Sequence, residues 1–227
     1  MARKIPRHWL PAAGCIAAMS PLLPGCSSTG IAMREAFGYA KREQLVDRVT
    51  DARDEQVEAK KQFESALEEF LAVTGTGGSP TTRELEGRYS TLKSSYEASE
   101  AKAQAVRDRI QSVENVADAL FKEWRGELSQ YSDPSLRSLS QKQLDDTRSQ
   151  YDRLLAAMKN ASSKMDPVLV KFKDQVLFLK HNLNARAIAS LQGTAVQVQG
   201  DVTALIREME SAINEADTFI REMQANG

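Results

Sequence analysis

The stretch from Leu85 to Trp124 constrains the fold of this chain more than any other part. Apolar and small side chains recur there at alternating steps of four and three residues for over five heptads, and no Pro interrupts them. An α-helix has about 3.6 residues per turn, so this spacing makes one stripe about 60 Å long. A stripe of that length must be covered by other helices. Its members are Leu85, Tyr89, Leu92, Tyr96, Ser99, Ala103, Val106, Ile110, Val113, Ala117, Leu120 and Trp124.

Three further segments repeat the same spacing, over residues 45–73, 144–172 and 191–223. The first of these belongs to a helical pattern that begins at about Ile31. Its one polar member is Gln56, which could set the register between helices as buried amides do in coiled coils. Extra apolar neighbours broaden each stripe beyond a two-residue seam, which favours a multi-helix bundle over a two-stranded coil.

Turn-forming residues separate these segments. The run Gly75 to Pro80 ends the first helix, and Thr81 or Thr82 can cap the second, which we expect to end near Tyr131. Asp133 is typical of an N-cap and Pro134 of a first helical residue.

The boundary between the third and fourth segments is less marked. A tight reversal is expected near residues 181–185, because Asn both ends and caps helices. If the chain instead continued straight, the two segments would form one rod of about 90 residues. Pro167 falls inside the third helix and predicts a kink or a break there.

The fold class that follows is all-α, an elongated antiparallel helical bundle or coiled coil of three to four long helices. We expect a single domain over residues 31–224. The formal net charge of −1 argues against a nucleic-acid partner, because such proteins carry a basic excess.

The first 25 residues have the pattern of a secretory signal. Three basic residues precede an apolar run of about 15 residues, which is shorter than the roughly 20 that a spanning helix needs. Residues 22–28, Leu-Leu-Pro-Gly-Cys-Ser-Ser, resemble the bacterial lipobox, in which the Cys becomes the lipidated first residue of the mature chain. Cys26 is the candidate lipidation site, and residues 26–30 form a short tether. The alternative is an ordinary secreted leader that leaves Cys26 as a free thiol.

The number of cysteines favours lipidation. Cys15 lies inside the leader, which leaves Cys26 without a disulfide partner in the mature chain. Because Ser27 rather than Asp follows the Cys, the resemblance implies an outer-membrane lipoprotein that faces the periplasm. The expected membrane contact is made through the lipidated Cys26.

Three segments resemble a known family. They are Asp174–Ile188, with the sequence DQVLFLKHNLNARAI, Val116–Trp124, with VADALFKEW, and Leu45–Val49, with LVDRV. Together they resemble the DUF2959 family of bacterial envelope proteins, over about residues 36–222. This resemblance implies a helical protein of Gram-negative bacteria. It supplies no activity and no catalytic residues.

The residue inventory disfavours an enzyme. Beyond the leader His181 is the single histidine, and no Cys is available to help it bind zinc. No Gly-rich phosphate loop and no nucleophile elbow are present. We therefore expect no catalytic residue, no metal site and no cofactor.

One polar cluster stands beside a very apolar stretch. It consists of Lys180, His181, Asn182, Asn184 and Arg186. Its ordinary interpretation is a capped turn whose amides satisfy helix ends. The alternative is a binding site for a partner, either another envelope protein or the cell wall.

These observations predict a non-enzymatic, lipid-anchored periplasmic bundle that acts as scaffold, spacer or adaptor. The alternative function is a ligand-binding or sensing module with a pocket near residues 167–186. Self-association with a second copy is also expected wherever an apolar stripe stays uncovered.

Overall fold

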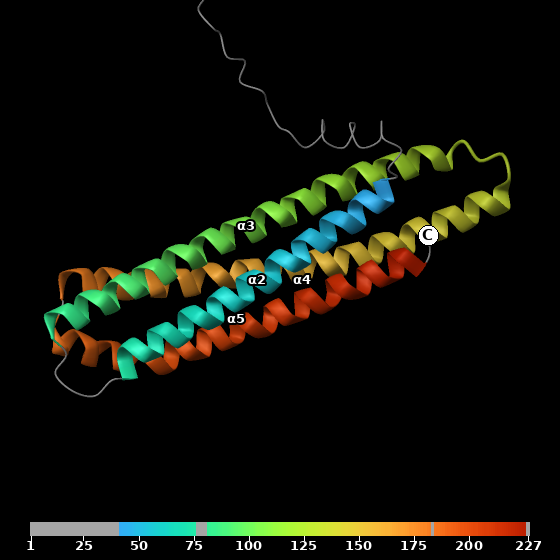
Figure 1. The fold of residues 1–227 in the computed structure, drawn as a ribbon. Helices are drawn as coiled ribbons and strands as arrows, with labels where there is room; N and C mark the ends of the chain where they lie inside the picture. Colours follow the sequence, from blue (N-terminus) through green and yellow to red (C-terminus); the bar gives the residue numbers. More distant parts are fainter. Residues whose placement is uncertain (1–40, 76–80, 183, 226–227) are drawn as a thin grey trace, which may run out of the picture.

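The computed structural model describes residues 41–75, 81–182 and 184–225, and all but a few of these are helical. The described helices are α2 (Lys41–Gly75), α3 (Thr82–Leu128), α4 (Pro134–His181) and α5 (Ala185–Ala225). They form one elongated antiparallel bundle (Figure 1). The predicted all-α class is confirmed, with four long helices in the described part of the chain.

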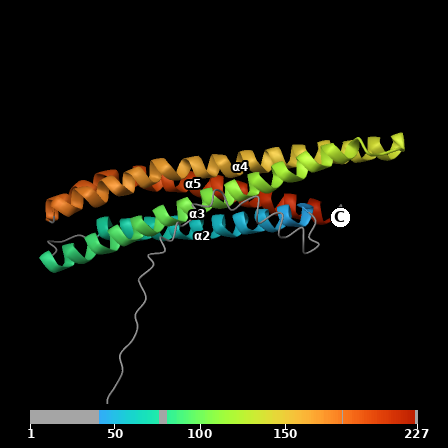
Figure 2. The same ribbon diagram turned by 90° about the horizontal axis from the view of Figure 1, so that it is seen from above.

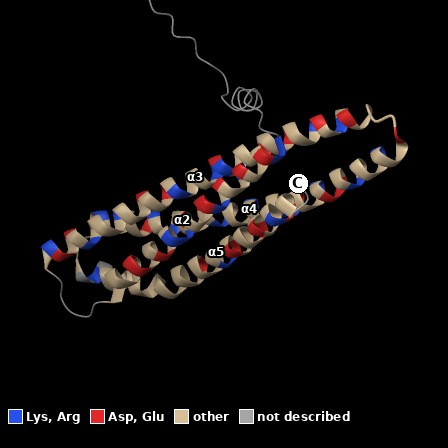
Figure 3. Cartoon of the chain, turned by 45° about the vertical axis from the view of Figure 1, so that its right-hand side comes forward, with Lys and Arg blue, Asp and Glu red and all other residues tan. Residues whose placement is uncertain are grey.

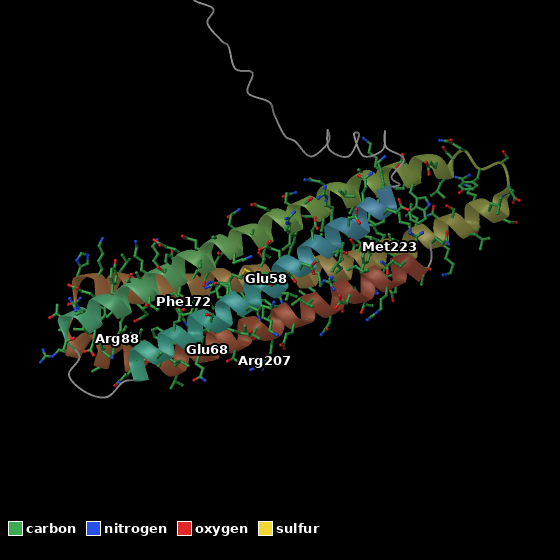
Figure 4. All side chains as sticks on the ribbon, viewed as in Figure 1. Glu58, Glu68, Arg88, Phe172, Arg207 and Met223 are labelled. Atoms are coloured by element: carbon green, nitrogen blue, oxygen red, sulfur yellow. The ribbon has the colours of Figure 1, made fainter. Side chains whose placement is uncertain are left out.

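The four helices lie at the corners of a square. α2 packs beside α3 and α5, and α4 packs beside the same two helices, so that α2 and α4 are diagonal partners. Their side chains still meet at the centre, where the ring centroids of Phe70 and Phe172 are 6.2 Å apart. The square is therefore filled along its axis, and Figure 4 shows Phe172 within the bundle.

The predicted seams form the core. In α2 every predicted seam residue from Leu45 to Val73 is buried, including Gln56. In α3 the seam is buried except for Tyr89, Tyr96 and Trp124, of which the two tyrosines pack against the core while partly exposed. Each fully buried Phe or Leu contributes about 1.5–3 kcal/mol relative to its exposure to water, so packing dominates the stability.

Ion pairs between neighbouring helices fix the order of the square. α2 is joined to α3 and to α5, and α4 to the same two helices, each time by two or more pairs. A single exposed pair contributes at most about 1 kcal/mol, so these contacts specify neighbours more than they stabilise the fold. The pairs between α2 and α3 are Lys41–Glu123, Lys102–Glu55 and Arg109–Asp51, and those between α2 and α5 are Arg53–Asp217 and Lys60–Glu210. The pairs between α3 and α4 are Arg107–Asp166 and Lys159–Glu114, and those between α4 and α5 are Lys164–Glu208 and Lys171–Asp201.

The helix starts follow the predicted capping. Thr81 caps α3 through a capping box, in which its hydroxyl accepts the N–H of Glu84 and the carboxylate of Glu84 accepts the N–H of Thr81. Asp133 caps α4, with Pro134 as its first residue. The end of α3 was predicted near Tyr131, but the helix stops at Leu128.

α4 continues as one helix through Pro167 to His181. The predicted reversal falls between His181, the last residue of α4, and Ala185, the first residue of α5. The third and fourth predicted helices are therefore two elements, and the single rod of about 90 residues is wrong. Pro167 does not break α4, and the kink expected there stays a prediction. Among the described residues, no helix is long and apolar enough to cross a membrane.

Candidate functional site

At one end of the bundle, α3 and α4 extend beyond the other two helices (Figures 1 and 2). Lys41, the first residue of α2, pairs with Glu123 at 2.8 Å, so α2 begins beside that point of α3. Lys164 of α4 pairs with Glu208 of α5, and in an antiparallel pair the last residue of α5 then lies opposite residue 147. We call the two-helix part beyond these points, residues 124–146, the overhang.

The overhang holds its two helices together by a few contacts. The indole N–H of Trp124 donates to the hydroxyl of Ser140 at 2.9 Å, which joins the end of α3 to the start of α4. Leu128 and Leu144 are buried. Every residue from 129 to 139 is exposed. The overhang is thus a short helical hairpin with a minimal core of its own.

The tip of the overhang carries large apolar side chains in contact with water. Tyr131 is 42% exposed, Leu136 is 52% exposed and Leu139 is 62% exposed. They line an open hollow of about 380 Å³, together with Ser140, Lys142, Gln143 and Asp146. The sequence contains a signal that Leu136 and Leu139 are exposed, because neither residue belongs to the 4-3 spacing of the buried stripe that includes Leu144.

The tip is poor in acidic residues. Between Leu128 and Leu144 the one acid is Asp133, whose carboxylate accepts the backbone N–H groups of Ser135 and Leu136 at 2.7 and 3.4 Å. The bases in the same range are Arg137 and Lys142. A hydrogen bond to Asp146 raises the pKa of Lys142 above its ordinary value, so this side chain stays charged.

Where the overhang joins the four-helix part, a second hollow of about 310 Å³ opens to solvent. Its walls carry two arginines, Arg42 and Arg153, and one carboxylate, that of Asp146. Arg42 also donates to the backbone oxygen of Met223 at 2.9 Å, which ties the start of α2 to the end of α5; Figure 4 marks Met223 at this end. The remaining lining residues are Trp124, Gln143, Thr147, Ser149 and Gln150.

Aromatic packing closes the core just inside this hollow. The rings of Phe121 and Tyr151 meet edge to face at 5.4 Å, and the guanidinium of Arg148 lies 5.0 Å from the centroid of Phe121. Burial, and then the charges of Glu114 and Asp118, raise the pKa of Tyr151. Its hydroxyl therefore stays protonated at neutral pH and is suited to a structural role.

The predicted polar cluster lies at the opposite end, at the α4–α5 turn. Asn182 is the C-cap of α4, with its side-chain amide donating to the backbone oxygen of Phe178 at 2.9 Å. The N–H of Asn184 donates to the oxygen of Asn182 at 2.8 Å. Lys180, His181 and Arg186 are exposed. This geometry matches the capped-turn interpretation, and the partner-binding role of the cluster stays a prediction.

Cys26 and the expected leader and tether lie outside the described residues. Within residues 41–75, 81–182 and 184–225, no group of three or more His, Cys, Asp or Glu side chains could hold a metal ion. His181 stands exposed in the last turn of α4. The chemistry that the described site offers is recognition through apolar, basic and amide groups.

The fold and this end of the bundle define an all-helical bundle with an extended hairpin. The family model described as "Protein of unknown function (DUF2959)" matches residues 31–223, and the chain belongs to that family. No curated protein and no solved structure matches the chain.

Proposed function

We propose that the protein is a non-enzymatic, lipid-anchored helical bundle that acts as scaffold, spacer or adaptor on the periplasmic side of the outer membrane. One observation carries this proposal: the described fold begins with Lys41 at one end of the bundle, 15 residues after Cys26. An anchor at Cys26 would hold that end near the membrane. The other end would then project by about the length of α2, roughly 50 Å.

The surface chemistry supports a role in assembly. Ion pairs join neighbouring helices on all four sides, and one hydrophobic core runs through the four-helix part. Charged side chains of both signs are distributed along the helices (Figure 3). A stiff body of this kind can hold a partner at a fixed height, and its action requires no chemical step.

Replacing Cys26 tests the anchor. With Cys26→Ser, we expect the protein to move from the membrane fraction to the soluble periplasmic fraction, because a single serine cannot carry the lipid. The mass of the mature wild-type N-terminus should show a diacylglyceryl group and an amide-linked acyl chain on Cys26. Two such anchors make membrane attachment stable.

Cys15→Ser serves as the matched control, because this residue belongs to the expected leader. It should leave membrane attachment unchanged. If Cys26→Ser stays as firmly bound to membranes as the wild type, the anchoring proposal is wrong.

A second candidate function, ligand binding or sensing near residues 167–186, is supported by exposed apolar side chains in the last part of α4. Val170, Leu177 and Phe178 are 56%, 46% and 39% exposed. Arg186→Ala and Leu177→Ser should then abolish complementation of a deletion strain without lowering the thermal midpoint. A fall in the midpoint would instead indicate a structural role for these residues.

A further inference from the structure

We propose that the tip of the overhang rests in the headgroup region of the lipid surface to which the chain is anchored, with Tyr131, Leu136 and Leu139 inserted. The inference rests on the proposed anchoring through Cys26. The inserted tip would be a second contact with the same membrane. It would also orient the bundle so that the two-helix end faces the membrane.

The side chains at the tip have the chemistry of the membrane interface. Tyrosine combines an apolar ring with a polar hydroxyl and is enriched at headgroup level, and leucine supplies apolar area that inserts just below it. Tyr131, Leu136 and Leu139 gather around one open hollow at the α3–α4 turn. Their exposure cannot be relieved by α2 or α5, because neither helix reaches the tip.

The charge of the tip is close to balanced. Residues 128–144 contain two bases, Arg137 and Lys142, and a single acid, Asp133. Asp133 is held at the helix start by the N–H groups of Ser135 and Leu136. The chain after residue 25 has 27 basic and 31 acidic side chains, a net charge of −4. Lys142 is paired with Asp146, so the charge of the tip is close to balanced, and its contact with lipid depends on the apolar side chains rather than on charge.

The position of the tip allows it to reach the membrane while the chain stays anchored. The first 13 residues of α4 lie beyond α5, so the overhang is about 20 Å deep. The 14 residues between Cys26 and Lys41 can span at most about 50 Å, or about 30 Å if the helical pattern expected from Ile31 is formed. The chain between the anchor and the bundle is therefore long enough for the tip to touch the surface.

A second set of exposed apolar side chains could contact the membrane instead of the tip, and it provides the control position for the test. Val170, Leu177, Phe178 and Val196 are exposed on α4 and α5, toward the opposite end of the bundle. Along α4, Leu177 lies 38 residues after Leu139, or about 57 Å. A bundle that stands on its tip keeps this patch in water, whereas a bundle that lies on its side or stands reversed does not.

Site-specific fluorescence in proteoliposomes tests the proposal. Once its leader is removed and Cys26 is lipidated, the chain has no free thiol. An environment-sensitive dye can therefore be attached to Leu136→Cys or, as the matched control, to Leu177→Cys. Both positions are exposed, so the fold should survive, and circular dichroism checks this. The vesicles contain phosphatidylethanolamine and phosphatidylglycerol, and the full lipidated protein is reconstituted.

We expect the dye at position 136 to shift to the blue, to be quenched by brominated lipid, and to be protected several-fold from aqueous iodide. The dye at position 177 should behave as in water. Adding Leu139→Ser and Tyr131→Ser to the labelled Leu136→Cys chain should reduce the protection at position 136. Equal access of iodide to positions 136 and 177, or protection at position 177 alone, overturns the proposal.

The same labels in the non-lipidated Cys26→Ser chain, without vesicles, separate lipid from protein as the covering partner. We expect the dye at position 136 to be open to iodide there. Protection without lipid would mean that a second copy or another segment of the chain covers the tip, which also overturns the proposal. If the lipidated chain is membrane-bound but iodide still reaches the dye at position 136, the inference about the tip is wrong and the anchoring proposal stands. If Cys26→Ser stays membrane-bound in cells, the anchoring proposal is wrong as well.

Discussion

α3 and α4 run through both the four-helix part of the bundle and the overhang, yet the two regions differ in how they bury large apolar side chains. In the four-helix part, Phe63, Phe70 and Phe121 are fully buried, because helices on both sides cover each seam. In the overhang only two helices remain, and Leu136, Leu139 and Tyr131 stay in contact with water. The comparison shows that the overhang buries fewer large apolar side chains, because two helices rather than four are present at its level to cover them.

The largest difference between the two regions should appear in stability. Phe70→Ala removes a ring that packs against Phe172 in the centre of the square. We expect a loss of about 3–5 kcal/mol in the free energy of unfolding, measured by chemical denaturation. Leu139→Ala in the overhang is the control and should change this free energy by less than about 0.5 kcal/mol. Equal losses in the free energy of unfolding for the two variants would contradict the difference proposed between the two regions.

The second prediction concerns an imperfection inside the four-helix part. Gln56 is fully buried, and neither atom of its side-chain amide has a hydrogen-bond partner among the described residues. Gln56→Leu should therefore raise the free energy of unfolding by about 1–3 kcal/mol, because it removes an unpaired amide from an apolar site. Gln150→Leu, at the edge of the polar hollow, should bring no such gain. A loss of stability with Gln56→Leu would show that the amide has a partner after all.

The third prediction addresses the contact that holds the overhang together. Trp124→Phe keeps an aromatic ring but removes the indole N–H that Ser140 accepts. The expected cost is about 1 kcal/mol, and Ser140→Ala should cost a similar amount. In a double-mutant cycle the two losses should not add, because they remove the same hydrogen bond. Fully additive losses would indicate that the bond contributes nothing to stability.

The smallest effect is expected at the start of α3, at the end away from the overhang. The backbone N–H of Thr81, and then its hydroxyl, lower the pKa of Glu84 below its ordinary value of 4.5. A lowered folded-state pKa contributes stability that is fully present above pH 4.5 and is lost as the pH falls through the folded value. When the thermal midpoint is plotted against pH, Glu84→Gln should slightly reduce the fall at acidic pH, which we call the acid limb.

Glu86→Gln removes the same charge from the same helical turn and is the control for that titration. Glu86 is exposed and is not part of the capping box. It should leave more of the acid limb intact than Glu84→Gln does. Identical curves for the two variants would show that the capping box has no measurable effect.

Much of the fold could be predicted from the sequence, because the 4-3 spacing reports directly which side chains face other helices. It identified Gln56 as a core position, and the Asp133–Pro134 pair separately identified the start of α4. The very apolar stretch beside the polar cluster is Val176 to Leu179, and a helical period cannot bury four consecutive residues. The structure buries Val176 and Leu179 and leaves Leu177 and Phe178 exposed.

The overhang could not be predicted in the same way. The spacing within a helix says which face is covered, but the axial offset between helices depends on contacts across the bundle, such as Lys41–Glu123 and Lys164–Glu208. The sequence therefore predicted Trp124 as one more seam residue. In the structure it lies at the border of the two regions, partly exposed, with its N–H bound to Ser140.

Hydrogen–deuterium exchange along the purified chain tests the contrast between the two regions most directly. The account predicts the slowest amides in the four-helix levels of α3 and α4, around residues 99–120 and 151–172. Within the helical turns of the overhang, residues 134–146, exchange should be at least about tenfold faster, since few buried contacts oppose their local opening. Equally slow exchange in both regions would contradict the account, because it would mean that something covers the overhang in solution.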